Sequence, residues 1–225
     1  MAITHESEME KPRRWRRLAL GATAGGLAIA AAFALDDWAN GVTRRPVGSG
    51  QLKAILAASR CWGDGVTLVG IVIGAIAMQP KRWKSLAGVL IVTLVCGGIV
   101  DRSKLISARK RPDETHPAPA RDSWTVPENA GRNSSFPSGH SATAFAFARG
   151  LSLVYPPLAP VGVALASSTA ASRMFEQRHY LSDCTVGGLF GWFAAGLLWN
   201  AARGAWRRMS PREETREVPK LRLVS

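Results

Sequence analysis

Three short blocks of the sequence carry the residue types that are needed to move a phosphoryl group. Together they supply three cations, two imidazoles and one carboxylate. Arginine stays charged and contacts phosphate through two parallel hydrogen bonds, whereas lysine acts as a point charge. The blocks therefore predict one phosphate-handling site. They are Lys104 with Arg111 and Pro112, then Pro137, Ser138, Gly139 and His140, and finally Ser172 and Arg173 with His179 and Asp183 beyond them.

The first block predicts two cations on one helix face. Lys104 and Arg111 are seven residues apart, which is close to two helical turns, and Pro112 would end such a helix. A lysine at the end of a membrane helix also reaches toward lipid headgroups, so Lys104 alone fits either interpretation. Arg109 and Lys110 are the better candidates for headgroup contact, because no motif requires them.

The second block predicts the start of a helix that points at an anion. Ser135 is the expected N-cap, and Pro137 lies near the first helical position, where its missing amide costs nothing. The Ser138 hydroxyl and the Gly139 amide could then donate to phosphate oxygens, with the helix dipole adding a favourable potential. An ordinary capped helix start explains the same residues, and His140 would then be only an interfacial side chain.

The third block predicts an oriented imidazole. His179 and Asp183 are four residues apart, so they are neighbours on one face if a helix begins before Asp183. Asp183 could then accept the Nδ1 proton and leave Nε2 free for attack. The alternative is a pair that only stabilises a helix end, worth about 0.2 to 0.5 kcal/mol. The joint occurrence of three blocks favours the catalytic interpretation.

The three blocks in this order resemble the signature of the type 2 phosphatidic acid phosphatase superfamily, which also contains the vanadium haloperoxidases. The resemblance covers roughly residues 86–202. It implies that His179 attacks phosphorus to give a phosphohistidine, and that His140 protonates the departing oxygen and later activates water. Asp183 would hold the attacking ring. The resemblance assigns phosphate binding to Lys104, Arg111, Ser138, Gly139 and Arg173.

Six apolar segments predict an all-α integral membrane bundle, and membrane members of the resembled family also have six spans. A span needs about 20 residues, so the first and last segments qualify best. Basic residues cluster before the first segment, between the second and third, and after the sixth, which assigns those ends to the cytoplasm. The segments are Leu18–Leu35, Gly65–Met78, Leu86–Val100, Ala142–Leu158, Val161–Ala171 and Val186–Ala202.

This topology divides the chain into three parts. Residues 1–17 are the expected basic cytoplasmic segment, residues 18–203 the six-span phosphatase domain, and residues 204–225 a cytoplasmic tail. Both termini are then cytoplasmic in a multi-pass protein of the inner membrane. Residues 41–50 read as an outer turn. Residues 112–137 form a long polar loop between the third and fourth spans on the extracytoplasmic side, where a loop of this length serves as a lid or substrate rim.

Three further features leave alternatives open. The Ala32–Phe33–Ala34 stretch imitates a signal-peptide cleavage site, although an uncleaved anchor is favoured because the apolar run is long. Cys61, Cys96 and Cys184 are too few for a disulfide framework and read as packing residues. Arg149 lies inside an apolar segment, where a charge is expensive, and either has a function or reaches toward the interface.

The expected activity is hydrolysis of a lipid phosphate or pyrophosphate, without a cofactor. The three cations make a divalent metal unnecessary, and no His-Glu-x-x-His or paired acidic motif is present to hold one. Phosphatidic acid, phosphatidylglycerol phosphate, an isoprenoid pyrophosphate and a lipid A phosphate remain possible substrates. A lipid phosphotransferase and a non-catalytic lipid-phosphate binder or transporter are the rival functions.

The net charge of +13 also raises the question of a nucleic-acid partner. Basic residues that face a polyanion form a patch or stripe on a soluble fold. In this sequence they bracket apolar segments instead. We therefore expect a membrane and a lipid phosphate as partners, and no nucleic acid. The oligomeric state stays open.

Overall fold

The structure is a computed structural model that describes residues 4–45, 50–112, 119–125 and 134–209. The described part is helical, and its one β-bridge is an isolated contact between Arg109 and Trp124. The prediction of an all-α fold is confirmed. The helices are α1 (Thr4–Ala34), α2 (Asp36–Thr43), α3 (Gly50–Arg60), α4 (Gly65–Met78), α5 (Trp83–Ser103), α6 (Gly139–Val154), α7 (Ala159–Phe175) and α8 (Leu181–Met209), and short 3-10 turns lie between several of them.

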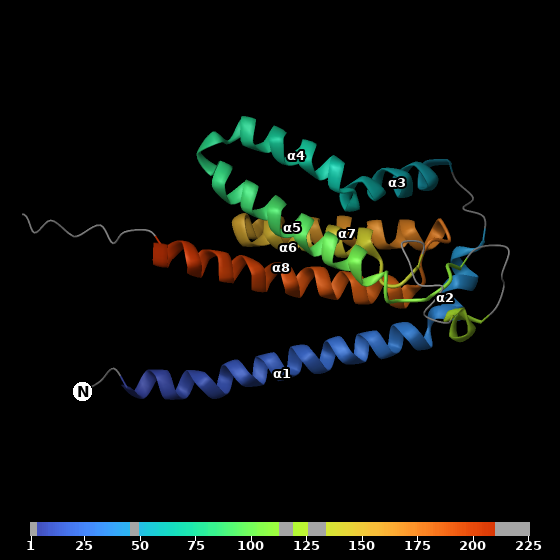
Figure 1. The fold of residues 1–225 in the computed structure, drawn as a ribbon, viewed down its shortest axis with the longest axis horizontal. Helices are drawn as coiled ribbons and strands as arrows, with labels where there is room; N and C mark the ends of the chain where they lie inside the picture. Colours follow the sequence, from blue (N-terminus) through green and yellow to red (C-terminus); the bar gives the residue numbers. More distant parts are fainter. Residues whose placement is uncertain (1–3, 46–49, 113–118, 126–133, 210–225) are drawn as a thin grey trace, which may run out of the picture.

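Helix α6 is the centre of the bundle, and its most extensive contacts are with α8, α5 and α7 (Figure 1). Its buried face consists largely of alanines, so neighbouring backbones approach closely. A Cβ atom at Gly187 or Gly191 of α8 would collide with the backbone of Ser138 or Ala142. The glycines therefore allow the start of α8 to lie directly against the start of α6, which brings the second and third sequence blocks together.

An apolar cluster packs the helices together at the end of the bundle opposite the starts of α6 and α8. It joins α4, α5, α6 and α8, and the Trp62 and Phe147 rings pack edge to face with 5.0 Å between ring centroids. Lipid tails are as apolar as these side chains, so it is close van der Waals packing that holds helices together inside a membrane. The cluster therefore fixes α4 and α5 against α6. Its buried members are Leu68, Val72, Leu86, Val89, Phe147 and Trp199.

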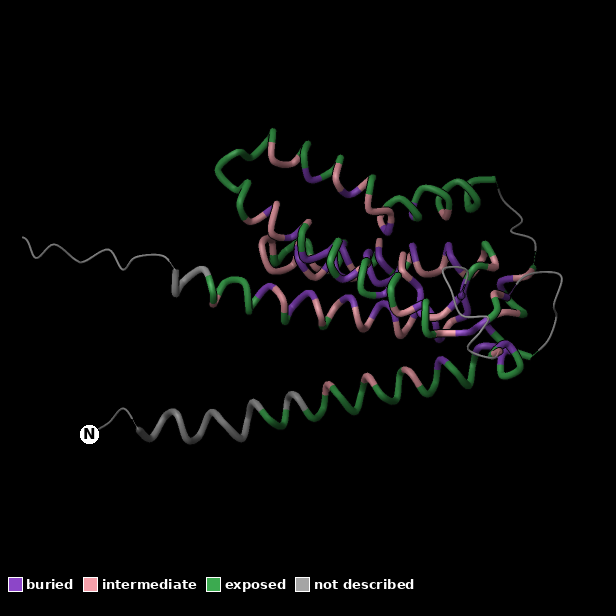
Figure 2. The backbone as a smooth tube through the Cα atoms, viewed as in Figure 1, coloured by how far each residue is buried: buried purple, intermediate pink, exposed green. Residues whose placement is uncertain are grey.

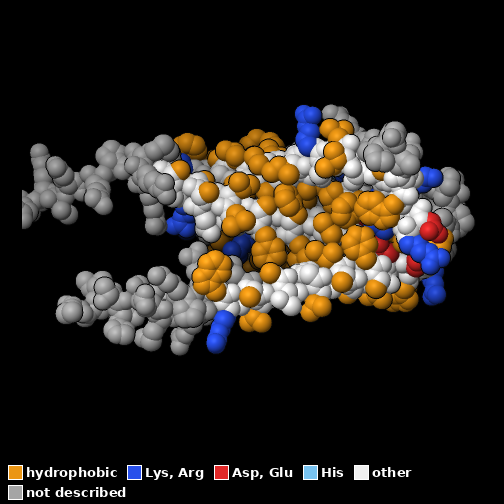
Figure 3. Space-filling view, turned by 60° about the horizontal axis from the view of Figure 1, so that its bottom comes forward, with side chains coloured by type: hydrophobic (Ala, Val, Ile, Leu, Met, Phe, Trp, Pro, Cys, Tyr) orange, Lys and Arg blue, Asp and Glu red, His pale blue; other side chains and the backbone are white. Residues whose placement is uncertain are grey.

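The surface between the ends of the bundle is strongly apolar. Figure 3 shows hydrophobic side chains over most of one face, with lysine and arginine mainly toward its ends. Ile73, Ile91 and Leu197 are among the large apolar side chains that are more than half exposed. An apolar surface of this extent is rare on a soluble monomer and is typical of a protein that contacts lipid.

Two helical segments are long and apolar enough to cross a membrane, namely Pro80–Ser103 with 24 residues and Leu181–Ala205 with 25. Two bent pairs bring the number to four if each pair is one span. These pairs are Ala19–Ala34 with Asp36–Thr43, bent by 59°, and Gly50–Gly63 with Gly65–Met78, bent by 76°. Each of the six predicted apolar segments lies largely in a helix, but the count of six spans stays a prediction, as do the domain bounds.

The sequence-based prediction missed α2 and α3. The expected outer turn over residues 41–50 overlaps the end of α2 and the start of α3, and only Arg44 and Arg45 form a turn in the described part. Asp36 and Asp37 end the apolar run of α1 and occupy the first turn of α2, where a negative charge stabilises a helix N-terminus. Helix α3 packs against α7 and so becomes part of the wall of the site.

Helix α1 stands apart from the bundle along most of its length (Figures 1 and 2). Most of its described side chains are exposed, and Leu20 and Leu27 each expose more than 60% of their surface. The helix approaches α8 toward its C-terminal end, where Ala32 is buried. Polar contacts of Asp36, just beyond this end, tie α1 to the bundle, as described below.

Candidate active site

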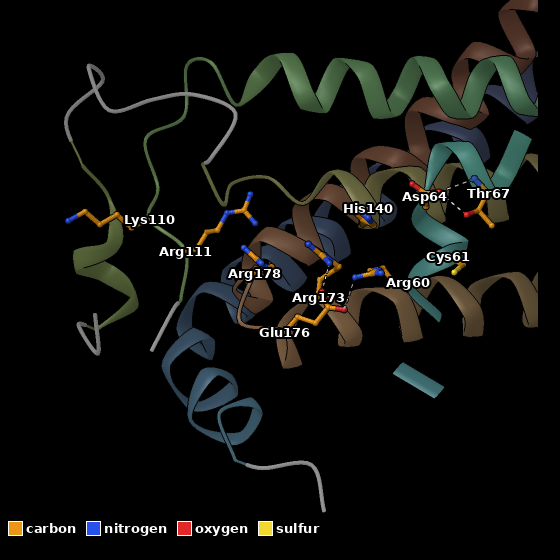
Figure 4. A pocket seen from close by; sticks show the side chains of 10 residues that line it. All are labelled: Arg60, Cys61, Asp64, Thr67, Lys110, Arg111, His140, Arg173, Glu176 and Arg178. Carbon is orange, nitrogen blue, oxygen red and sulfur yellow. Dashed lines mark hydrogen bonds and ion pairs between the residues drawn. The ribbon is translucent and has the colours of Figure 1, made fainter. Parts of the chain in front are cut away.

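Two cavities lie at the end of the bundle where α5 stops and where α6 and α8 begin. The smaller cavity has a volume of about 440 Å³, and the larger one, shown in Figure 4, about 990 Å³. They share Asp64, Arg111, His140 and Arg173. The smaller cavity brings together residues of all three sequence blocks, namely Lys104, Arg111, Gly139, His140, Arg173 and His179.

The first block reaches the site by a different path from the predicted one. Helix α5 ends at Ser103 with Lys104 as its C-cap, and Arg111 lies in the extended segment that follows, so the predicted two-turn helix is wrong. Lys104 is nevertheless buried, and its Nζ atom lies 3.2 Å from Oδ1 of Asp101. The two cations therefore meet at the smaller cavity because the chain turns back after α5.

In the second block the helix starts later than predicted. Ser138 is the N-cap of α6, so the assignment of Ser135 as N-cap, with Pro137 near the first helical position, is wrong. The Ser138 hydroxyl is fully buried, accepts hydrogen bonds from the Ser141 amide (3.4 Å) and hydroxyl (3.0 Å), and lines neither cavity. Ser138 thus caps α6, and its contact with phosphate stays a prediction.

Gly139 does line the smaller cavity. A Cβ atom at this position would lie 3.1 Å from Oδ1 of Asp101 and 3.5 Å from Nζ of Lys104. Glycine therefore keeps space open beside the buried lysine. Because Gly139 is the first residue of α6, backbone amides at this end of the helix carry the positive end of the helix dipole toward any anion in the cavity.

The His179 ring is oriented by a backbone carbonyl rather than by Asp183. Its Nδ1 atom lies 2.6 Å from the carbonyl oxygen of Ser135. A carbonyl only accepts, so Nδ1 carries the proton and Nε2 of the neutral ring keeps its lone pair. The Oδ2 atom of Asp183 is 3.7 Å from Nδ1, which is too long for a hydrogen bond. The predicted Nδ1 acceptor was therefore wrong, although the predicted tautomer follows from the Ser135 contact.

Asp183 instead stabilises the start of α8. It is fully buried, and its Oδ2 atom accepts a hydrogen bond from the backbone amide of Tyr180 at 2.8 Å. Its Oδ1 atom lies 2.6 Å from Nη1 of Arg109. The carboxylate still lies near the His179 ring, where its charge favours the imidazolium form that follows attack on phosphorus.

Arg109 is a structural centre that the sequence interpretation missed. It exposes only 2% of its surface, so the predicted headgroup contact is wrong. Its Nη2 atom lies 2.7 Å from Oδ2 of Asp36, and its Nη1 and Nε atoms donate to Ser182 (2.7 Å) and Ser123 (2.9 Å). The guanidinium also lies over the Tyr180 ring, 4.1 Å from its centroid. Every side-chain nitrogen of this buried cation is paired.

Other residues of the cavities were also missed. Asp64 caps α4, and its Oδ2 atom accepts hydrogen bonds from the Thr67 amide (2.9 Å) and hydroxyl (2.7 Å). Glu176 and Arg178 line the larger cavity, and their position between Arg173 and His179 was a signal that the sequence did contain. Arg60 reaches the cavity through the packing of α3 on α7, which no spacing in the sequence indicates.

Burial and like charge both act on the two histidines. Burial, followed by the charge of Arg173, lowers the pKa of His140 to about 4. Burial also lowers the pKa of His179, against the opposing effect of Asp183. An ordinary histidine has a pKa of about 6.5. Both rings are therefore neutral at pH 7 before an anion binds.

Three other predicted features have structural explanations. The Arg149 guanidinium lies over the Trp192 ring, 5.1 Å from its centroid, and lines neither cavity. All three cysteines are free, and Cys96 and Cys184 are buried packing residues as predicted. Cys61 is exposed and lines the larger cavity, so its assignment as a packing residue was wrong. The described residues contain no cluster of three histidine, cysteine or acidic side chains that could hold a metal ion.

Apolar helices form the bundle, and two histidines and three cations line one cavity at its end. This combination is typical of a membrane protein whose site binds phosphate. The model of the PAP2 superfamily matches residues 82–207, which is more than half of the chain. The protein therefore belongs to the PAP2 superfamily, and the resemblance seen in the three sequence blocks is confirmed.

Named relatives agree with this assignment. The lipid A 1-phosphatase of Rhizobium etli is 29% identical over 205 residues, which cover 80% of this chain and 87% of that protein. The lipid A 1-phosphatase of Porphyromonas gingivalis is 30% identical over 148 residues, 60% of this chain but only 30% of that longer protein. The crystal structure of a transmembrane PAP2-type phosphatidylglycerolphosphate phosphatase from Bacillus subtilis superimposes with a TM-score of 0.58 at 19% identity, covering 84% of this chain and 98% of that one. The fold is thus that of a transmembrane PAP2 protein.

Proposed function

We propose that this protein hydrolyses the phosphate or pyrophosphate monoester of a membrane lipid through a phosphohistidine on His179. One observation carries the proposal: both histidine rings and three cations from separate parts of the chain line the same small cavity. Lipid phosphate as substrate is supported by the names of the relatives, two of which are lipid A 1-phosphatases.

In the first step the Nε2 lone pair of His179 attacks phosphorus, and the bond from phosphorus to the lipid oxygen breaks. The transition state of phosphoryl transfer is loose and carries its charge on the equatorial oxygens. Positioned cations therefore supply much of the acceleration. Lys104, Arg111 and Arg173 line the cavity where this charge would develop, and the start of α6 adds its amides.

His140 serves both steps in this mechanism. It protonates the departing lipid oxygen, then takes a proton from the water that attacks the phosphohistidine, so that the bond from nitrogen to phosphorus breaks and free phosphate leaves. The pKa of His140 is about 4 in the free protein, so the ring is neutral before the substrate binds. It receives the proton for the first step either from the substrate phosphate or from water, once the bound anion has raised this pKa. Neutral His140 is then ready for the second step.

We place the site on the extracytoplasmic side, with both termini in the cytoplasm. Helix α5 follows the basic turn Pro80–Arg82 and ends beside the cavities at Lys104. The described ends of α1 and α8, toward the two termini, lie at the same end of the bundle as this turn (Figure 1). Short basic loops stay in the cytoplasm. The cavities lie at the opposite end, where lipid phosphates of the outer leaflet are accessible.

Phosphate release from purified lipid phosphates in detergent, with wild type beside His179→Ala, tests the proposal. We expect release by the wild type alone and correct membrane insertion of both proteins. Release without an added lipid alcohol separates a hydrolase from a phosphotransferase that uses the same intermediate. A wild type that binds these lipids without releasing phosphate would instead be a binder or transporter.

A further inference from the structure

The carboxylate of Glu176 contacts Arg173, one of the three cations that line the smaller cavity with both histidines. Its Oε2 atom lies in close contact with Nη1 of Arg173, which is buried. Figure 4 shows this contact together with a longer one, of 3.9 Å, from Oε1 to Nη1 of Arg60. The Ser172 hydroxyl donates to Oε1 at 3.3 Å. Glu176 is therefore held between the ends of α3 and α7, and Arg173 is the nearer of its two cations.

The stability of α7 does not explain an acid at position 176. The helix ends at Phe175 with Glu176 as its C-cap, and the Glu176 amide donates to the carbonyl oxygen of Ser172 at 2.9 Å. A negative charge at this end of a helix is unfavourable, because the helix dipole is also negative there. The contact with Arg173, three residues earlier, offers a better reason for the carboxylate.

This contact occupies only one part of the Arg173 guanidinium. Glu176 accepts from Nη1, whereas Nε is buried and has no hydrogen-bond partner among the described residues. Nε and Nη2 form one edge of the guanidinium fork, from which two parallel hydrogen bonds can reach a phosphate. A buried donor without a partner costs free energy until a ligand supplies an acceptor. The Nε edge is therefore the part of Arg173 that suits a bound anion.

Glu176 and the proposed substrate phosphate approach Arg173 from different cavities. Arg173 lines both cavities at this end of the bundle, but of the two Glu176 lines only the larger one. His179, which attacks phosphorus in the proposed mechanism, lines only the smaller one. A carboxylate in the smaller cavity would repel the substrate. From the larger cavity it can hold the guanidinium without occupying the position of the phosphate.

We propose that Glu176 is a positioning residue for Arg173. Its contact with Nη1 keeps the guanidinium from turning and directs the Nε edge toward the phosphate that His179 attacks. The contribution of Arg173 to the transition state then depends on Glu176, although Glu176 touches no substrate atom. This inference rests on the proposed function. Orientation matters because misplacement of a positioned group by about 1 Å can cost about 100-fold in rate.

A double-mutant cycle with Arg173→Gln tests this role. Phosphate release is measured with the purified lipid phosphate that the wild type hydrolyses fastest. We expect Glu176→Ala to lower kcat/KM by about 10- to 100-fold, and Arg173→Gln to lower it by about 100- to 1,000-fold. Added to Arg173→Gln, Glu176→Ala should cause less than about a twofold further loss, because the group that it positions is gone.

Two results of this cycle would overturn the proposal. Losses that multiply in the double variant would show that Glu176 acts independently of Arg173. A higher kcat/KM in Glu176→Ala than in the wild type would show that the carboxylate competes with the substrate for the cation.

Glu176→Gln and Asp122→Asn are the matched variants. Glutamine keeps an oxygen that accepts from Nη1 but loses the charge, so kcat/KM should fall by only about three- to fivefold. The same cycle can be run with this variant if Glu176→Ala does not fold, and its loss should also vanish in Arg173→Gln. Asp122 is an exposed acid beside Arg121 that lines neither cavity, so Asp122→Asn should leave kcat/KM within about twofold.

Binding of inorganic phosphate keeps this inference separate from turnover. The Kd, measured from the shift in Tm of the purified protein, should rise by about five- to tenfold in Glu176→Ala. It should not rise further when Glu176→Ala is added to Arg173→Gln. If the wild type releases no phosphate from any lipid but shows this dependence, the positioning role stands and the proposed function fails. Equal Kd values in the wild type and Glu176→Ala, with lipid hydrolysis intact, would overturn the positioning role alone.

Discussion

The Arg109 guanidinium contacts the Asp183 carboxylate at 2.6 Å, and both groups are almost completely buried. Asp36 contacts the same guanidinium at 2.7 Å from the junction of α1 and α2. The backbone amide and the hydroxyl of Ser182 donate to Asp36 at 2.8 and 2.6 Å. One cation therefore connects the first helix to the turn that positions His179.

Arg109→Met should destabilise the protein strongly. It leaves Asp36 and Asp183 buried without their cation, and breaking a buried ion pair in this way costs about 3 to 5 kcal/mol. Unfolding in detergent measures the loss. We also expect a lower kcat, because the start of α8 loses its anchor beside His179.

The matched control for Arg109→Met is Arg121→Gln, because Arg121 is an exposed arginine in the same loop region. The free energy of unfolding of the Arg121→Gln protein should stay within about 0.5 kcal/mol of the wild-type value. Equal stability of Arg109→Met and Arg121→Gln would contradict a structural role for the buried cation. An Arg109→Lys protein should lie between the two, since lysine keeps the charge but not the forked geometry.

The pH dependence of kcat/KM should be shifted toward acid. Burial lowers the pKa of His179, so the nucleophile stays neutral, and active, below the ordinary value of about 6.5. His140 is unprotonated at neutral pH, so the leaving-group proton comes with the monoanionic substrate, and activity should fall as pH rises above about 6, the second pKa of a phosphate monoester. A profile of kcat/KM from pH 4 to 9 measures both limbs. An acid limb centred at 6.5 would show that burial does not shift the nucleophile.

The loss of rate caused by His140→Gln should depend on the leaving group of the substrate. Removal of a general acid and base costs about 100- to 10,000-fold in rate. The first step needs no acid when the leaving group is a nitrophenolate, so phosphorylation by p-nitrophenyl phosphate should lose much less than phosphorylation by phosphatidic acid. Stopped-flow release of nitrophenol followed by slow phosphate release would be the expected pattern. Equal losses with both substrates would remove the acid role from His140.

A chelator should leave the activity unchanged, whereas vanadate should inhibit it. The cations of the smaller cavity take the place of a divalent metal in the proposed mechanism, so phosphate release should persist in EDTA. Vanadate, which adopts the geometry of the phosphoryl transition state, should inhibit. Loss of activity in EDTA with recovery on addition of magnesium would contradict the mechanism.

The sequence predicted the members of the smaller cavity better than the paths that bring them there. Lys104, Arg111, His140, Arg173 and His179 could be recognised because the spacing of the blocks is specific. Whether a helix ends at Ser103 or continues to Pro112 depends on tertiary contacts, which override local periodicity. Both paths place the cations near one another, so the error left the site intact.

The partners of Arg109 could not be predicted from spacing. Asp36 is 73 residues away along the chain, and it meets Arg109 only because α1 returns to the start of α8. From sequence alone, an arginine near the end of an apolar segment has the same pattern whether it contacts headgroups or a buried carboxylate. An acidic pair placed directly after an apolar run, as Asp36 and Asp37 are, was the sequence signal for a buried cationic partner.

Trapping of the phosphorylated protein decides whether His179 is the nucleophile. Brief reaction of His140→Gln with a radiolabelled activated phosphate, followed by alkaline quenching and peptide mapping, should give a base-stable, acid-labile phosphate on the peptide that contains His179. The double variant with His179→Ala should carry no label. Label on another residue, or rapid turnover by His179→Ala without any phosphoprotein, would contradict attack by His179.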